Sequence, residues 1–61
     1  MEALVRSAAQ RLYSIPGVVG VGWDGRSLIV YVESENVKPR IPATVLGLRT
    51  VVKVVGRIRP L

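Results

Sequence analysis

The groups that could carry acid–base or nucleophilic chemistry in this 61-residue chain are few, because it contains four carboxylates, no histidine and no cysteine. Acid–base catalysis needs a positioned pair of titratable groups, and a serine or threonine nucleophile needs a neighbouring base. Asp24 precedes Gly25 in an expected turn, and Glu33 and Glu35 stand at an expected strand end, where solvated acids are common. Imidazole and thiolate metal ligands are also missing. We therefore expect no enzymatic activity, no small-molecule substrate, no cofactor and no metal site.

The segment Gly20-Val21-Gly22 contains the spacing of a phosphate-binding loop, but its context is wrong for one. A dinucleotide fingerprint places its glycines between a strand and a helix, so that phosphate meets the helix N-terminus. Here the glycines fall inside an expected strand. Two interpretations remain: a neighbouring Tyr31 covers Gly20, or both glycines admit the close approach of another backbone or ligand.

The charge of the chain is strongly positive, with nine Lys and Arg against four Asp and Glu, a net charge of +5. Such a balance favours anionic partners, either nucleic acid or an acidic protein surface. An excess of Lys and Arg is also a property of thermophile proteins. The single Asn and single Gln agree with a thermophilic source, since both amides are thermolabile.

The elements that must position these charges begin with a helix predicted over residues 1–14. Its apolar residues recur at spacings of three and four, at Leu4, Val5, Ala8, Leu12 and Ile15. Pro16 and Gly17 then end the helix.

A β-hairpin follows, because two β-rich runs, residues 18–23 and 26–34, flank Asp24-Gly25. A two-residue turn at Asp24-Gly25 predicts that Trp23 lies opposite Arg26. Directly opposed residues share a face. The core face is then expected to hold Val19, Val21, Leu28, Val30 and Val32, with Trp23 at its rim. The other face is expected to hold Val18, Gly20, Gly22, Ser27, Ile29, Tyr31 and Glu33.

The remaining chain predicts a connection over residues 35–47, a short helix within it at residues 42–47, and a last strand over residues 48–58. Pro at the start and Gly at the end of 42–47 are typical of a helix. The last strand presents Thr50, Val52, Val54 and Ile58 to the core. We therefore predict one α+β domain over residues 1–61, in the order α-β-β-α-β, with a three-stranded, mainly antiparallel sheet and the helices on one face.

This arrangement leaves one sheet face open, and we interpret it as a binding face. Its members are expected to be Ile29, Tyr31, Arg49, Val51, Lys53, Val55 and Arg57, beside the candidate close-approach glycines Gly20 and Gly22 and flanked by Lys38, Arg40 and Arg59.

Three interpretations of this face stay open. Its apolar centre suits self-association as a homodimer, or docking of another protein, since a chain this small buries little surface alone. Its cations and its tyrosine suit single-stranded RNA or DNA, or a ribonucleoprotein, although sheet readers of RNA usually show two or three aromatic residues. In the third interpretation the face binds nothing and is only solvated, and its valines are present because they favour strands.

The location predicted from the sequence is the cytoplasm, without a membrane partner. No apolar run approaches the roughly 18 residues of a membrane span. Glu2 and Arg6 interrupt the N-terminal region where a signal peptide would have its apolar segment.

The run Ser14 to Gly22 after a helix resembles a small uncharacterised prokaryotic α+β module. In that module a helix leads to PGVVGVG, a VYVE strand, an IP…G connection and a final strand with G-x-I. The matching segments here are Val30–Glu33, Ile41-Pro42 with Gly47, and Gly56-Arg57-Ile58. The resemblance implies a structural pattern and no activity. A looser similarity, to ferredoxin-like metal-binding domains, does not include their first strand or their cysteine loop, so metal binding does not follow.

Overall fold

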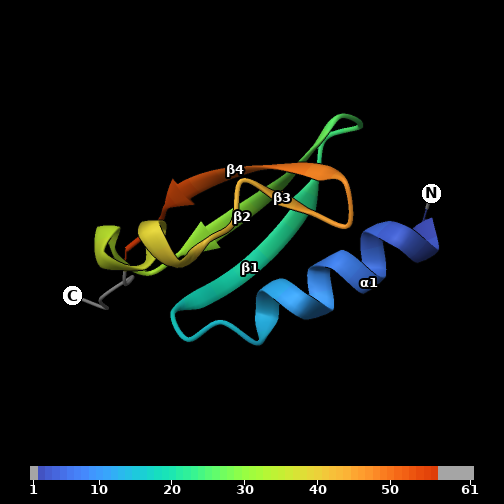
Figure 1. Ribbon diagram of the computed structural model, residues 1–61. Coiled ribbons are helices and arrows are strands. Elements are labelled where there is room, and N and C mark those ends of the chain that lie inside the picture. The colour runs from blue at the N-terminus through green and yellow to red at the C-terminus, as the bar shows by residue number, and fades with distance from the viewer. Residues whose placement is uncertain (1, 57–61) are drawn as a thin grey trace.

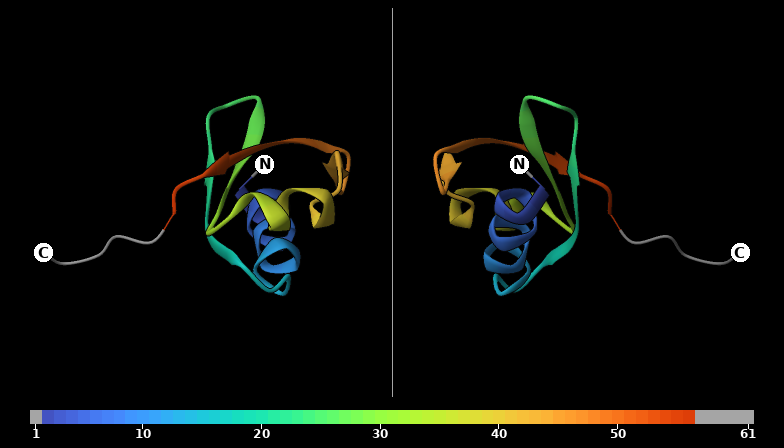
Figure 2. Two further views of the ribbon diagram at one scale, coloured as in Figure 1. Left: turned by 90° about the vertical axis from the view of Figure 1, so that its left-hand side faces the viewer. Right: turned by 90° about the vertical axis from the view of Figure 1, so that its right-hand side faces the viewer.

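The computed structural model describes residues 2–56, which form one α-helix, one 3₁₀-helix and a four-stranded mixed sheet (Figure 1). The elements are α1 (Glu2–Tyr13), β1 (Val18–Trp23), β2 (Ser27–Val32), η1 (Glu35–Arg40), β3 (Thr44–Val45) and β4 (Leu48–Val54). The strand order is β1-β2-β4-β3, and only β2 and β4 run parallel. The sheet is curled, and α1 and η1 both lie on its concave side (Figure 2). The α+β class is confirmed.

The segment 42–47 is not the helix expected from its proline and glycine. Thr44 and Val45 form β3, which pairs with Arg49 and Leu48 of β4. The backbone N–H of Thr50 donates to the carbonyl of Ala43 (2.9 Å), and the Thr50 hydroxyl donates to the carbonyl of Pro42. These bonds hold the segment extended along β4, so the sheet has four strands where three were expected. The helical turn of the connection lies earlier, in η1.

The β3–β4 turn consists of Leu46 and Gly47, and both residues have positive φ, 52° and 82°. Type I′ turns require positive φ at both central positions. A leucine in this region costs about 1–2 kcal/mol relative to a glycine. Because the hydrogen bonds of Thr50 secure the start of β3, Leu46 is held in this conformation.

The β1–β2 turn is displaced from the position expected from Asp24-Gly25. Trp23 lies opposite Leu28, not Arg26, so the predicted register is wrong by two residues. The Asp24 side chain causes the displacement, because its Oδ1 accepts the backbone N–H groups of Arg26 (2.7 Å) and Ser27 (2.6 Å). Gly25 (φ 97°) and Arg26 thereby become the central pair. A slip of two residues preserves the alternation, so each side chain of the turn-proximal part keeps its predicted face.

Near its start, β1 contains a β-bulge that the sequence pattern did not indicate. Val18 pairs with Val32 and Gly20 with Tyr31, which leaves Val19 as the extra residue. Val19 was expected in the core but is 54% exposed, whereas Val18, expected outside, packs against the core. A bulge inserts one residue and so reverses the alternation behind it.

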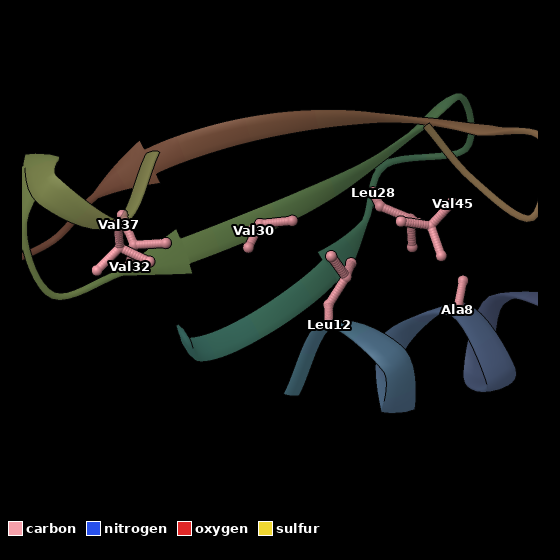
Figure 3. Packing of buried hydrophobic residues seen from close by; sticks show 7 residues of the cluster. All are labelled: Ala8, Leu12, Leu28, Val30, Val32, Val37 and Val45. Atoms are coloured by element: carbon pink, nitrogen blue, oxygen red, sulfur yellow. The ribbon is translucent and has the colours of Figure 1, made fainter. Parts of the chain in front are cut away.

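The core lies between α1, η1 and the concave side of the sheet (Figure 3). Ala8 and Leu12 of α1 are fully buried against the sheet, and burial of a side chain such as Leu12 stabilises the fold by about 2 kcal/mol. Val37 of η1 is also buried. Leu4 departs from the predicted apolar stripe and is exposed, and Ile58 lies outside the described residues. The remaining fully or largely buried members are Leu28, Val30, Val32 and Val45.

Gly17 joins α1 to β1 and cannot be replaced by another residue type without strain. Its φ is 96°, a region that side-chain-bearing residues rarely adopt. A Cβ at this position would overlap Cγ2 of Val37, and the Gly17 carbonyl accepts the N–H of Glu33 (3.0 Å). The tight passage between η1 and β1 therefore depends on a bare backbone.

We predict that Gly17→Ala destabilises the fold more than Gly25→Ala. Both positions have nearly the same φ, 96° and 97°, so both substitutions cost about 1 kcal/mol through backbone strain. Only Gly17 would bring its Cβ against Val37, because no atom lies within 4 Å of a Cβ at Gly25. The overlap adds about 1–3 kcal/mol. Urea unfolding of both variants measures the difference, and equal losses would contradict the role of Val37.

We predict an acid-sensitive contribution from Asp24. The N–H groups of Ser27 and Arg26 hold the pKa of this carboxyl below its ordinary value of 3.8. The unfolded chain therefore binds the proton more readily, and the stabilising effect, complete above the ordinary pKa, is lost as the pH falls through the lower folded pKa. Thermal unfolding between pH 6 and about pH 2 should show a smaller acid-induced loss in Asp24→Asn than in the parent chain. Glu35→Gln, outside the turn, is the control and should retain that loss.

Candidate interaction face

The register of the sheet brings five predicted binding residues onto one face. Ile29 lies opposite Val51, Tyr31 opposite Lys53, and Arg49 opposite Ser27. On the other side of β2, Gly22 pairs with Ile29 and Gly20 with Tyr31. Since paired residues share a face, these positions form one surface, which we call the open face: Gly20, Gly22, Ile29, Tyr31, Arg49, Val51 and Lys53.

Among the described residues, no helix covers the open face. The residues that alternate with it, Leu28, Val30 and Val32, are fully buried in the core with residues of α1 and η1 (Figure 3). Arg49, Val51 and Lys53 of β4 are exposed, and Ile29 and Tyr31 of β2 are half-buried. The open face is thus apolar along β2, and it carries its two cations on β4.

Tyr31 occupies the space above the strand glycines. A Cβ at Gly20 would lie 3.4 Å from Cδ2 of Tyr31, and one at Gly22 would lie 3.8 Å from Cε2. One edge of the ring therefore extends along β1 from Gly20 to Gly22. Of the two interpretations of these glycines, the structure thus agrees with the one in which Tyr31 covers them. The ring fills the space that side chains at these positions would otherwise occupy.

Of the other predicted members of the binding surface, two lie on the other side of the sheet and one continues the open face. Lys38 and Arg40 are exposed on η1, which packs on the concave side of the sheet, so they do not extend the open face. Val55 follows β4 and continues its pairing, because its N–H donates to the carbonyl of Val32 (3.0 Å). Its alternation places it with Val51 and Lys53. Arg57 and Arg59 lie outside the described residues.

Thr44 is a neighbour of the open face that the sequence interpretation missed. It pairs with Arg49 and is exposed, so it extends the Ser27–Arg49 row by one strand. The prediction of a helix at 42–47 concealed it. The signal that could have revealed β3 is Gly47, whose position suits a two-residue hairpin turn as well as the end of a helix.

A groove of about 410 Å³ lies between the end of α1 and the β3–β4 turn. Arg11, Ile15, Pro42 and Leu46 are among its lining residues. The Ser14 hydroxyl, also in the lining, donates to the carbonyl of Arg11 (2.6 Å). Arg11 is the charged residue of this lining, so the groove offers no pair of titratable groups for acid–base chemistry.

Residues 2–56 contain no group of three or more His, Cys, Asp or Glu side chains that could hold a metal ion. In the same range, no helix has the length and apolar character that crossing a membrane requires. Comparisons with protein-family models, curated proteins and solved structures found no match to this chain. The resemblance to the prokaryotic module therefore stays a prediction.

Proposed function

We propose that this chain is a non-catalytic interaction module that self-associates, or docks a protein partner, through its open face. The observation that supports this proposal is the pairing of Ile29 with Val51 and of Tyr31 with Lys53 across parallel strands, on a face that no helix of residues 2–56 covers. Aromatic and aliphatic side chains at the centre of a surface, with charges at its margin, are typical of protein interfaces.

The size of the chain favours a partner for this face. A domain of about 60 residues buries only roughly 60% of its unfolded surface, so association adds apolar burial that the monomer lacks. Two open faces related by a two-fold axis would bring Ile29, Tyr31 and Val51 of each copy together. Glu33 follows β2 and is exposed, which offers a countercharge to Lys53 of the second copy.

Nucleic-acid binding is a second candidate, favoured by the Tyr31–Lys53 pair and by Arg49 on the same face. Cations that track phosphates beside an aromatic ring are a common design for single-strand binding on a sheet. Against it, the described part of the open face displays a single aromatic side chain. A basic dimer can also bind nucleic acid, so the two functions are compatible.

We predict that Tyr31→Glu dissociates the self-associated form. The substitution replaces the aromatic ring by a carboxylate beside Ile29, and even opposite Lys53 this charge would have to lose its water in a dimer interface, which is unfavourable. Sedimentation equilibrium at high protein concentration should show a dimer for the parent chain and a monomer for this variant. Leu4→Glu adds the same charge at an exposed apolar position of α1, on the concave side of the sheet, and should leave the dimer intact.

Circular dichroism would confirm that both variants fold. Val51→Lys, at a 38% exposed position of the open face, provides a second disruptive change with less effect on the core. A parent chain that remains monomeric at high concentration would contradict self-association and leave the docking of a different protein.

For the second candidate, we predict binding of a single-stranded oligonucleotide that weakens as salt rises. Each phosphate contact removed by Arg49→Gln or Lys53→Gln should lower the slope of log affinity against log salt by about one or slightly less. Lys38→Gln and Arg40→Gln, on the opposite side of the sheet, serve as controls that keep the slope. Fluorescence anisotropy measures both. No binding at low salt, or equal losses in all four variants, would exclude this use of the open face.

A further inference from the structure

The outer edge of β4 is only partly paired among the described residues. β3 pairs with Leu48 and Arg49 of β4. The last backbone hydrogen bond on this side of β4 runs from the N–H of Thr50 to the carbonyl of Ala43. From Val51 to Val54, β4 continues beside β2 alone, at the outside of this part of the sheet. In Figure 1 β4 extends well past the short β3.

Two hydrogen bonds establish which groups of β4 point outward. The N–H of Val55 donates to Val32 of β2, while the N–H of Thr50 donates to Ala43 on the opposite side. In a parallel ladder alternate residues bond to the same neighbour. Arg49, Val51 and Lys53 therefore bond to β2, and the N–H and C=O groups of Val52 and Val54 point outward from the sheet. A row of such groups is a template for another strand.

The opposite edge of the sheet, along β1, is protected in two ways. The bulge at Val19 interrupts its pairing geometry, and the outward N–H of Val21 donates to the Tyr13 hydroxyl (3.1 Å). Bulges and covering side chains are known means of keeping an edge from pairing with another chain. Within residues 2–56, the outward segment of β4 shows neither device, and Val54 on it is 40% exposed.

We propose that the β4 edge binds an extended segment of a partner protein, with an acidic residue opposite Lys53 and apolar residues opposite Val52 and Val54. The outward N–H and C=O groups supply main-chain hydrogen bonds, as in other strand-addition complexes. Residues opposite Val52 and Val54 fall on the concave side, where they cover exposed valine surface. The residue opposite Lys53 falls on the open face beside its ammonium group.

The charge of Lys53 selects an acidic segment over a second copy of this chain. Two β4 edges paired about a two-fold axis would be centred on Val52, Lys53 or Val54. When the axis passes through Lys53, the two ammonium groups are directly opposed. In the other two registers they are diagonal neighbours on one face, about 7–8 Å apart. Like charges so placed are unfavourable, and a lysine on an edge strand is a common means of preventing self-pairing. An acidic residue converts the same position into an attractive pair.

This inference goes beyond the proposed function, because it uses the backbone of β4 and not the apolar side chains of the open face. The test uses the full chain labelled with ¹⁵N and a short synthetic peptide of alternating valine and glutamate. Saturation with this peptide should protect the amide hydrogens of Val52 and Val54 from exchange. The amides of Val51 and Lys53 already bond to β2 and provide an internal control. A peptide with lysine in place of glutamate should give no protection.

Variants of Val54 and Lys53 separate the backbone contribution from the charge contribution. Val54→Pro removes one outward N–H without breaking a bond to β2, and it should abolish peptide binding, whereas Val54→Thr should retain it. Lys53→Glu should weaken binding of the glutamate peptide by about threefold to tenfold and reverse the preference between the two peptides. Val51→Lys, which also disrupts the open face but leaves the charge of Lys53 in place, should still bind the glutamate peptide, so failure of the open-face proposal and failure of this one are distinguishable.

Four outcomes would overturn the proposal. The first is that neither peptide protects Val52 and Val54, and the second is that both peptides protect them equally. The third is that these amides are already protected in the dilute free chain, which would mean that the edge is covered from within. The fourth is protection that appears without peptide as the protein concentration rises, which would assign the edge to a second copy.

Discussion

The alternation of β2 is the constraint on which the rest of the structure depends. β2 lies between β1 and β4, and its residues Leu28, Val30 and Val32 are fully buried while Ile29 and Tyr31 face the other way. Each neighbouring strand must match this alternation, because paired residues share a face. A slip of one residue in β4 would carry Lys53 toward the core and a valine outward, at a large cost in desolvation. The open face and the core are therefore two consequences of one pattern.

That pattern explains why much of the candidate face could be predicted from the sequence although the hairpin register was wrong. The pairing of β1 with β2 is shifted by two residues from the expected one. Tyr31 and Ile29 still occupy their expected face, because a shift of two leaves the alternation unchanged. The grouping of Arg49, Val51 and Lys53 follows from alternation within β4 itself. Neither prediction required the correct partner residue or the correct strand direction.

The features that could not be predicted depend on contacts between distant residues. Residues 42–47 have a proline and a glycine at positions that suit a helix or a hairpin arm, and the hydrogen bonds from Thr50 decide between them. The bulge at Val19 follows the passage at Gly17, where Val37 leaves no room for a side chain. The parallel direction of β4 follows from the route of the chain through η1 and β3. None of these contacts has a local periodicity.

The open face and the outer edge of β4 use different chemical groups, side chains in the first and backbone groups in the second, but they adjoin each other. The side chain of Lys53 lies on the open face, while its backbone bonds to β2; Val54 turns its side chain to the concave side and its backbone groups outward. A strand added at this edge would obey the same alternation, and every second side chain of it would extend the open face beside Val51 and Lys53. An acidic residue there would neutralise Lys53 and leave Ile29, Tyr31 and Val51 as a more apolar surface, with Arg49 as the remaining cation of the open face. If both proposals hold, occupation of the edge would make the open face less suited to polyanions and more suited to an apolar protein partner, and the edge would then control the face.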